Sequence, residues 1–121
     1  MSHLQVGRKG EDIAAKELKR RGYKVVDRNV VLAEGEIDLI AREGGQVVFV
    51  EVKTRSSDRF GAPQEAVDRT KQRRLTLLAS RWLKKQGLSQ SPARFDVVSV
   101  RLGKGEKPQV EIFRNAFEAC E

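Results

Sequence analysis

Cysteine and histidine are almost absent from this chain of 121 residues, which contains one of each. The single cysteine, Cys120, cannot form an internal disulfide, so a reducing cytoplasm is the expected environment. No group of cysteines and histidines has the spacing of a zinc site. Because His3 is the only histidine, the chain also lacks a base for a serine or cysteine nucleophile, and a nucleophilic triad is excluded.

Long apolar segments are also missing. No stretch approaches the roughly 20 apolar residues that cross a membrane, and the N-terminal residues lack the apolar core of a signal peptide. We therefore expect a soluble cytoplasmic protein without membrane contact. The length suits a single domain over residues 1–121. Lysine and arginine outnumber aspartate and glutamate by 24 to 17, and most of the excess lies in residues 61–121, which predicts an anionic partner for the second half.

The sequence patterns predict seven elements in the order α-β-β-β-α-β-β. Helices are expected at about 4–21 and 64–85, and strands at 23–32, 35–43, 46–54, 94–102 and 109–113. The helix between the third and fourth strands predicts a crossover, hence a mixed sheet with an antiparallel hairpin and at least one parallel neighbour. Residues 54–62 are expected to form a loop, with Pro63 in the first turn of the second helix. The apolar segment 115–120 either covers the core or contributes to an interface.

The second and third predicted strands flank Gly44 and Gly45, which is a strong hairpin signal. If these glycines form the loop, the opposed pairs are Glu43–Gln46, Asp38–Glu51 and Glu36–Lys53. Because side chains alternate along a strand, Asp38, Glu51 and Lys53 should project from one face. Directly opposed like charges destabilise a hairpin, so the two carboxylates predict a bound cation.

These residues suit phosphodiester hydrolysis. Asp38 and Glu51 provide the one or two carboxylates by which Mg²⁺ is commonly held. Lys53 can orient a nucleophile or stabilise the transition state, while the metal activates water and neutralises charge on a phosphate. Glu11, on the small-residue face of the first helix, is a further carboxylate that can bind metal directly or through water. The alternative is structural, because Glu-x-Lys is common in half-exposed strands and Glu36 can form an ordinary ion pair with Lys53.

The second predicted helix has one apolar stripe and one basic face. The stripe consists of Leu75, Leu78, Ala79 and Trp82, which are spaced for packing on a sheet. The basic face consists of Arg69, Lys71, Arg73, Arg74, Arg81, Lys84 and Lys85. It predicts salt-dependent, sequence-independent binding of nucleic-acid phosphates, and the alternatives are a solvated face or a docking site for an acidic protein. Because aromatic residues make up only 6%, duplex or branched DNA is expected rather than stacked single strands.

Two smaller features have structural explanations. The segment 7–10 (GRKG) lacks the pattern of a phosphate-binding loop, and close helix packing explains its glycines at least as well. Asp96, near the start of a predicted strand, is expected to anchor a loop or to pair with an arginine.

Several separate motifs are spread over nearly the whole chain: GRKGED at 7–12, GEIDLIA at 35–41, FVEVKTR at 49–55, FGAP at 60–63 and RFDVV at 94–98. Together they resemble the YraN family of small bacterial proteins. The hairpin with Asp38 followed by Glu51-x-Lys53 resembles the wider PD-(D/E)XK nuclease superfamily. Ile37 stands where that superfamily's motif has its proline.

The resemblance implies a restriction-endonuclease-like α/β fold, with a central mixed sheet flanked by helices and a relationship to archaeal Holliday junction resolvases. It implies phosphodiester cleavage with Mg²⁺, or Mn²⁺ as a substitute, and leaves a homodimer open because resolvases act as dimers. Residue by residue, it implies that Asp38 and Glu51 are metal ligands, that Lys53 is the catalytic lysine and that Glu11 is the first-helix acid. The alternative is a noncatalytic nucleic-acid-binding protein that retains the nuclease fold.

Overall fold

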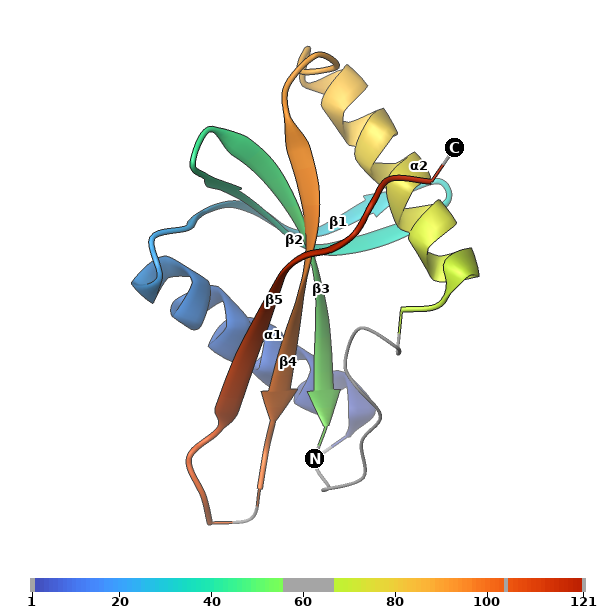
Figure 1. Cartoon of the computed structure of the whole chain (residues 1–121). Helices are drawn as coiled ribbons and strands as arrows, with labels where there is room; N and C mark the ends of the chain where they lie inside the picture. Colours follow the sequence, from blue (N-terminus) through green and yellow to red (C-terminus); the bar gives the residue numbers. More distant parts are fainter. Residues whose placement is uncertain (1, 56–66, 104, 121) are drawn as a thin grey trace.

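A five-stranded sheet with two helices packed on it forms the computed structural model, which describes residues 2–55, 67–103 and 105–120 (Figure 1). The elements in chain order are α1 (His3–Arg20), β1 (Lys24–Leu32), β2 (Gly35–Glu43), β3 (Gln46–Arg55), α2 (Arg69–Lys85), β4 (Ala93–Arg101) and β5 (Gln109–Phe117). This order confirms the α-β-β-β-α-β-β arrangement predicted from the sequence.

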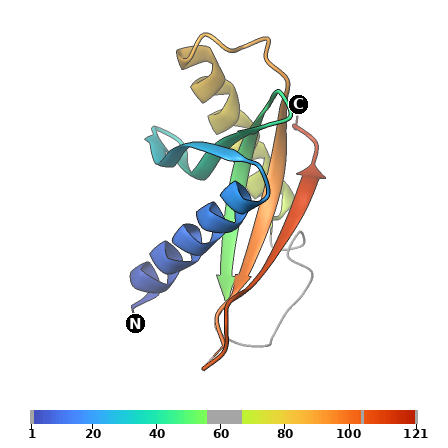
Figure 2. The same cartoon turned by 90° about the vertical axis from the view of Figure 1, so that its left-hand side faces the viewer.

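The strands lie in the sheet in chain order, from β1 to β5. Strands β3 and β4 are parallel, whereas the other neighbouring pairs are antiparallel. The predicted crossover and mixed sheet are therefore confirmed, with α2 in the connection between the two parallel strands. The two helices cover opposite faces of the sheet (Figure 2). Successive residues of β4 consequently enter different cores: Val97 packs on the α2 side and Val98 on the α1 side.

Each helix is amphipathic and buries one stripe. The α2 stripe of Leu75, Leu78, Ala79 and Trp82 is buried as predicted, and Trp82 meets Phe49 of β3 edge-on, with ring centroids 5.8 Å apart. On the other face, Ala14, Ala15 and Leu18 of α1 pack against the sheet. Neither helix of the described segments is long and apolar enough to cross a membrane.

The close contact between α1 and β3 depends on Gly10. A Cβ atom at this position would lie 1.8 Å from Oγ1 of Thr54, whereas a Cβ at Gly7 would meet nothing within 4 Å. Close helix packing therefore explains Gly10 but not Gly7.

Two alanine substitutions in α1 should have opposite effects on stability. We expect Gly10→Ala to lower the free energy of unfolding by about 1–3 kcal/mol, because the added methyl group overpacks the contact with Thr54. Gly7→Ala is the matched control and should raise stability by about 0.5–1 kcal/mol, because alanine loses less backbone entropy in a helix. Urea denaturation of both variants measures the difference. Equal shifts would contradict the packing argument.

The helix α2 begins later than predicted. Val67 and Asp68 precede the helix, so the predicted start at Gln64 is wrong. Asp68 is the N-cap, and its side chain accepts a hydrogen bond of 2.8 Å from the backbone N–H of Lys71. Aspartate is favoured at this position because its carboxylate satisfies a backbone donor that the helix leaves free. The loop was predicted at 54–62, but Thr54 and Arg55 belong to β3; residues 56–62 and Pro63 lie outside the described residues.

A buried polar network links β4 to the rest of the fold. Asp96 is 1% exposed; its carboxylate pairs with Arg94 and accepts hydrogen bonds from Tyr23 Oη at 2.8 Å and from the Asn115 backbone N–H at 2.9 Å. Burial, together with the hydrogen bond to Asp96, raises the pKa of Tyr23 to about 12. Arg94 also pairs with Glu43 of β2 at 2.7 Å. The structural role expected for Asp96 is therefore confirmed.

The strand β5 continues to Phe117, four residues beyond the predicted end at 113. The pairing with β4 shifts register between Phe95 and Val97, and Asn115 has a left-handed backbone with φ of 50°. Phe117 then stacks on Phe95, with ring centroids 4.7 Å apart. The apolar segment 115–120 was expected either to cover the core or to contribute to an interface. The structure supports the first option, because Ala116 and Phe117 pack against the core.

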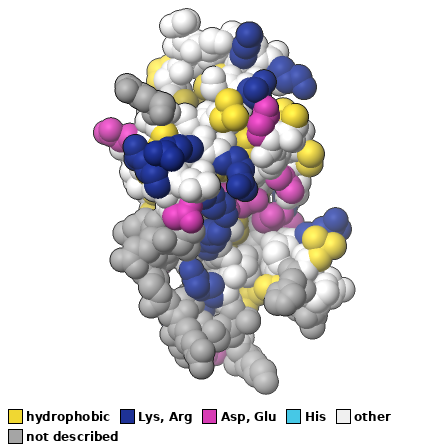
Figure 3. Space-filling view, turned by 90° about the vertical axis from the view of Figure 1, so that its right-hand side faces the viewer, with side chains coloured by type: hydrophobic (Ala, Val, Ile, Leu, Met, Phe, Trp, Pro, Cys, Tyr) yellow, Lys and Arg dark blue, Asp and Glu magenta, His cyan; other side chains and the backbone are white. Residues whose placement is uncertain are grey.

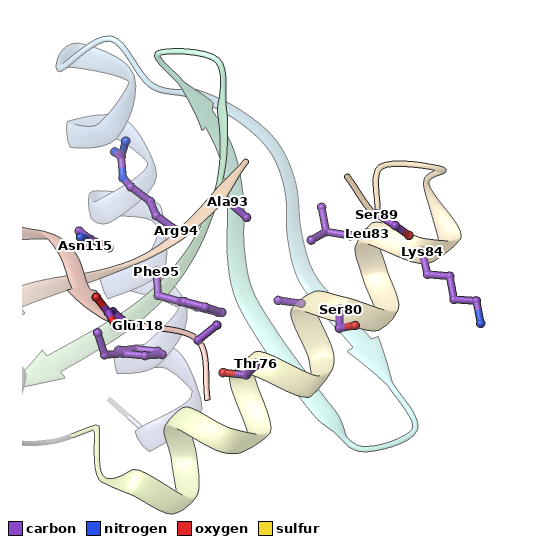
Figure 4. A pocket seen from close by; sticks show the side chains of 13 residues that line it. Thr76, Ser80, Leu83, Lys84, Ser89, Ala93, Arg94, Phe95, Asn115 and Glu118 are labelled. Atoms are coloured by element: carbon purple, nitrogen blue, oxygen red, sulfur yellow. The ribbon is translucent and has the colours of Figure 1, made fainter. Parts of the chain in front are cut away.

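A hollow of about 410 Å³ lies between α2 and this C-terminal segment (Figure 4). Phe95 and Thr76 are among its lining residues, and Lys84 is the one residue of the predicted basic face among the described residues around it. The predicted carboxylates are not part of its described lining, so this hollow is separate from the candidate site.

Candidate functional site

The hairpin of β2 and β3 has the predicted register near its turn. Paired residues run from Glu43–Gln46 to Leu39–Val50. Gly44 and Gly45 have φ angles of 58° and 80°, which suits the two-residue turn that favours glycine.

Beyond Leu39 the two strands separate. Asp38 and Glu51 come directly after the last pair, while β2 continues its pairing with β1. The pairing does not extend to Glu36 and Lys53; Glu36 instead accepts a hydrogen bond of 3.0 Å from Asn29 Nδ2. The predicted opposed pairs Asp38–Glu51 and Glu36–Lys53 are therefore absent from the register of the two strands, and Asp38 and Glu51 lie where the hairpin opens. The ion pair of Glu36 with Lys53, considered as the alternative, is also absent among the described residues; Lys53 pairs with Glu51.

Asp38 is held at this opening by the backbone of β3. Its Oδ2 accepts a hydrogen bond of 2.8 Å from the Val52 N–H. Burial raises the pKa of Asp38 to about 7, and the negative charges of Glu51 and Glu11 add to the effect. Burial and the neighbouring carboxylates therefore disfavour the ionised form of Asp38 more than the Val52 hydrogen bond and the charge of Lys71 favour it.

Glu51 is buried, with 7% of its surface exposed, and faces two ammonium groups. Nζ of Lys53 lies 3.7 Å from Oε1 of Glu51, as expected for two residues on one face of β3. Nζ of Lys71, from α2, lies closer to the same oxygen, at 2.7 Å. The structure therefore brings Asp38, Glu51 and Lys53 together and adds a residue that the sequence assigned to another surface.

Lys71 was predicted as part of the basic nucleic-acid-binding face, and its contact with Glu51 was missed. The sequence signal that could have predicted this contact is the N-cap residue Asp68, because it places Lys71 in the first turn of α2. A crossover helix that connects parallel strands starts at the end where the first strand finishes. Its first turn therefore lies near Glu51 and Lys53, in the last half of β3.

The two lysines have opposite electrostatic environments. Burial, together with the neighbouring ammonium of Lys71, lowers the pKa of Lys53. For Lys71 burial acts in the same direction, but the hydrogen bonds to Glu51 and Lys53 and the negative charges of Glu51 and Asp38 together outweigh it and raise the pKa of Lys71. Lys71 is therefore the firm counterion of Glu51, and Lys53 is the amine that loses its proton more easily.

Glu11 reaches the site from α1. Its Oε1 accepts a hydrogen bond of 2.7 Å from Asn29 Nδ2, the same amide group that donates to Glu36. Glu11, Asn29, Glu36 and Asp38 line a hollow of about 460 Å³. The first-helix acid predicted from the sequence thus lies near Asp38, and Asn29 is a contact that sequence reasoning missed.

The donor set at the opening of the hairpin fits magnesium better than zinc. Among the described residues, no group of three or more histidine, cysteine, aspartate and glutamate side chains is arranged to hold a metal ion. Mg²⁺ commonly takes only one or two protein carboxylates and keeps water or phosphate oxygens in its other positions. Asp38 and Glu51 provide that number, and a bound cation would offset the repulsion between their two carboxylate charges.

The remaining cations of α2 form an exposed basic surface. Figure 3 shows lysine and arginine side chains gathered on this side of the molecule, with acidic side chains among them. We define the α2 basic surface as the exposed residues Arg69, Arg73, Arg74, Arg81, Lys84 and Lys85. Arg81 pairs with Glu34 at 2.8 Å. The predicted basic face is thus exposed, apart from the half-buried Lys71.

Sequence comparison assigns the chain to a family. The model described as "Uncharacterised protein family UPF0102" matches residues 10–100, and the chain belongs to this family. A UPF0102 protein of Rhodococcus jostii is 51% identical over 118 residues, which are 97% of this chain and 100% of that protein. One from Symbiobacterium thermophilum is 50% identical over 115 residues, 95% of this chain and 98% of the relative. UPF0102 is the YraN family, so the resemblance found in the sequence motifs is confirmed.

Two solved structures share a lower similarity with this chain. One is the EndoMS protein of a complex with double-stranded DNA, at 19% identity and a TM-score of 0.44, covering 74% of this chain and 34% of EndoMS. The other is Pyrococcus furiosus SfsA in complex with Ca²⁺, at 13% identity and a TM-score of 0.41, covering 91% of this chain and 62% of SfsA. Both scores are below 0.5, and the family assignment depends on the family model and the sequence relatives alone.

Proposed function

We propose that this protein is a nuclease-like enzyme that hydrolyses phosphodiester bonds in nucleic acid with a divalent metal ion. DNA is the proposed substrate, and branched DNA of the Holliday-junction kind is included. The observation that carries the proposal is the buried carboxylate of Glu51 at the opening of the hairpin, with Asp38 beside it and Lys53 at 3.7 Å. Paired carboxylates that share a site with a lysine of lowered pKa suit hydrolysis of a phosphodiester.

Each residue has a proposed role. Asp38 and Glu51 would hold Mg²⁺, or Mn²⁺ in its place, and this ion would supply Lewis acidity and an activated water. The Val52 N–H keeps the Asp38 carboxylate in position. Lys53 would orient the attacking water or stabilise negative charge on the phosphate. Glu11 lies near enough to Asp38 for its negative charge to help raise the pKa of Asp38, and it would act through water.

The α2 basic surface would hold the phosphate backbone. Its exposed cations can bind phosphates without reading bases, so affinity should fall steeply as salt concentration rises. A surface on the same helix as Lys71 is well placed to deliver the backbone toward the carboxylates.

Cleavage assays test the proposal directly. The purified protein is incubated with linear, flapped and four-way-junction DNA and with RNA, in Mg²⁺, in Mn²⁺ and in EDTA. We expect at least one DNA substrate to be cut with either metal and none in EDTA. Binding without cleavage on every substrate would contradict the enzymatic proposal and favour a noncatalytic role.

The second candidate is a noncatalytic nucleic-acid-binding protein. The α2 basic surface favours it, because binding through exposed cations does not require the buried carboxylates. Lys53→Met discriminates between the two candidates. In an enzyme we expect the variant to lower the cleavage rate about a hundredfold or more while DNA affinity, measured by fluorescence anisotropy, changes little. Wild-type protein that binds DNA and leaves it intact under all conditions would make the second candidate correct.

A further inference from the structure

The ammonium group of Lys71 is bound to Glu51, one of the two proposed metal ligands. Nζ of Lys71 lies 2.7 Å from Oε1 of Glu51, which is a normal distance for a charge-assisted hydrogen bond. Glu51 is buried, and the side chain of Lys71 is 33% exposed. A buried carboxylate is costly without a countercharge, so Lys71 stabilises Glu51 in the metal-free protein.

The backbone of Lys71 is fixed, whereas its side chain is partly exposed. The Lys71 N–H is bound by the N-cap Asp68 at 2.8 Å, and Gln72 Nε2 closes the same turn on the carbonyl of Val67 at 2.9 Å. The long side chain can therefore leave Glu51 by rotations of its own bonds, without movement of α2. Lys53 is a poorer counterion because its Nζ is 1 Å farther from the same oxygen.

We propose that Lys71 is an internal substitute for the metal ion: it competes with a divalent cation for the Glu51 carboxylate and, once displaced, becomes available to a phosphate of the substrate. This inference rests on the proposed function, since it requires Glu51 to be a metal ligand. It makes Lys71 a positioning residue of the site rather than a general member of the α2 basic surface. In the absence of nucleic acid, competition from Lys71 then lowers the affinity of the site for metal. A phosphate of the substrate raises this affinity, because it gives the displaced ammonium a new partner.

Metal titration of full-length protein tests the competition without any cleavage. Mn²⁺ binding is measured by calorimetry and by the electron paramagnetic resonance signal of free Mn²⁺, for wild type and for Lys71→Met, Lys53→Met and Glu51→Gln. We expect Lys71→Met to bind Mn²⁺ about three- to tenfold more tightly, because methionine keeps the apolar stem and removes the competing charge. Lys53→Met should change the affinity less, and Glu51→Gln should weaken it. Lys71→Arg restores a competing cation and should lie near wild type.

The outcomes separate this inference from the function on which it rests. If wild type binds Mn²⁺ through Glu51 but Lys71→Met binds it equally or more weakly, Lys71 does not compete with the metal ion. The proposal that Glu51 is a metal ligand is then still supported. If neither wild type nor the two methionine variants bind Mn²⁺, the metal site itself is wrong and both proposals fall. Thermal denaturation of each variant in EDTA confirms that an altered affinity does not come from a loss of folded protein.

Discussion

Glu51→Gln is expected to lower the rate of metal-dependent cleavage by at least about a thousandfold, because the change removes a charged ligand and much of the attraction for the cation. Glutamine has nearly the same shape as glutamate and can still accept the hydrogen bond from Lys71. The fold should therefore survive. Single-turnover cleavage of the best DNA substrate, with Mg²⁺ at several concentrations, measures the effect.

A partly exposed carboxylate away from the site provides the control for this prediction. Glu17 lies on α1 and pairs with Arg20, so Glu17→Gln changes net charge by the same amount away from the site. This variant should retain the wild-type rate. If Glu51→Gln cleaves as fast as Glu17→Gln, Glu51 is not a metal ligand and any observed nuclease activity has another origin.

The largest loss of stability is expected from Asp96→Ala. The substitution leaves Arg94 with 7% of its side chain exposed and without its partner on β4, and it also removes the acceptor for Tyr23 and for the Asn115 N–H. Breaking a buried ion pair from one side costs about 3–5 kcal/mol, and the buried Arg94 keeps as counterion the partly exposed Glu43, which it shares with Arg114. Domains of this size are commonly stable by about 5–15 kcal/mol, so the variant should be close to unfolding.

An exposed pair of the same chemistry is the matched control. Asp12 of α1 pairs with Arg28 of β1, and both side chains are exposed. Asp12→Ala should lower the free energy of unfolding by less than about 1 kcal/mol. Guanidinium denaturation of both variants provides the comparison. Similar losses would mean that the Asp96 network contributes no more than a surface ion pair.

The hairpin could be predicted because its determinants are local. Two adjacent glycines set the turn, and the turn sets the pairing for the residues next to it. The prediction failed beyond Leu39 for a tertiary reason: β2 leaves β3 while it continues along β1, and no local pattern encodes that separation. Asp38 and Glu51 were still brought together, because they immediately follow the last paired residues.

Contacts that join distant parts of the chain could not be read from spacing. The extension of β5 depends on a hydrogen bond from Asn115 to Asp96, and Lys71 meets Glu51 only because the crossover brings α2 over β3. A periodic pattern identifies the buried face of a helix, as it did for Leu75 and Trp82. It does not show which charged residue on the other face contacts a residue of another element.

The opening of the hairpin makes the strand pairing itself part of the site. On the side of β3 that faces β2, the Val52 N–H has passed the last paired residues and bonds to the Asp38 carboxylate. The backbone pairing of β3 with β2 thus ends at Val50, and two residues later the backbone of β3 donates a hydrogen bond to the Asp38 side chain instead. Any sequence change in the turn at Gly44 and Gly45 that slips the strands by one residue would turn the hydrophobic neighbours of Asp38 toward Glu51. The conformation of the turn and the geometry of the carboxylates are consequently coupled, although the glycines lie at the opposite end of the hairpin from the carboxylates.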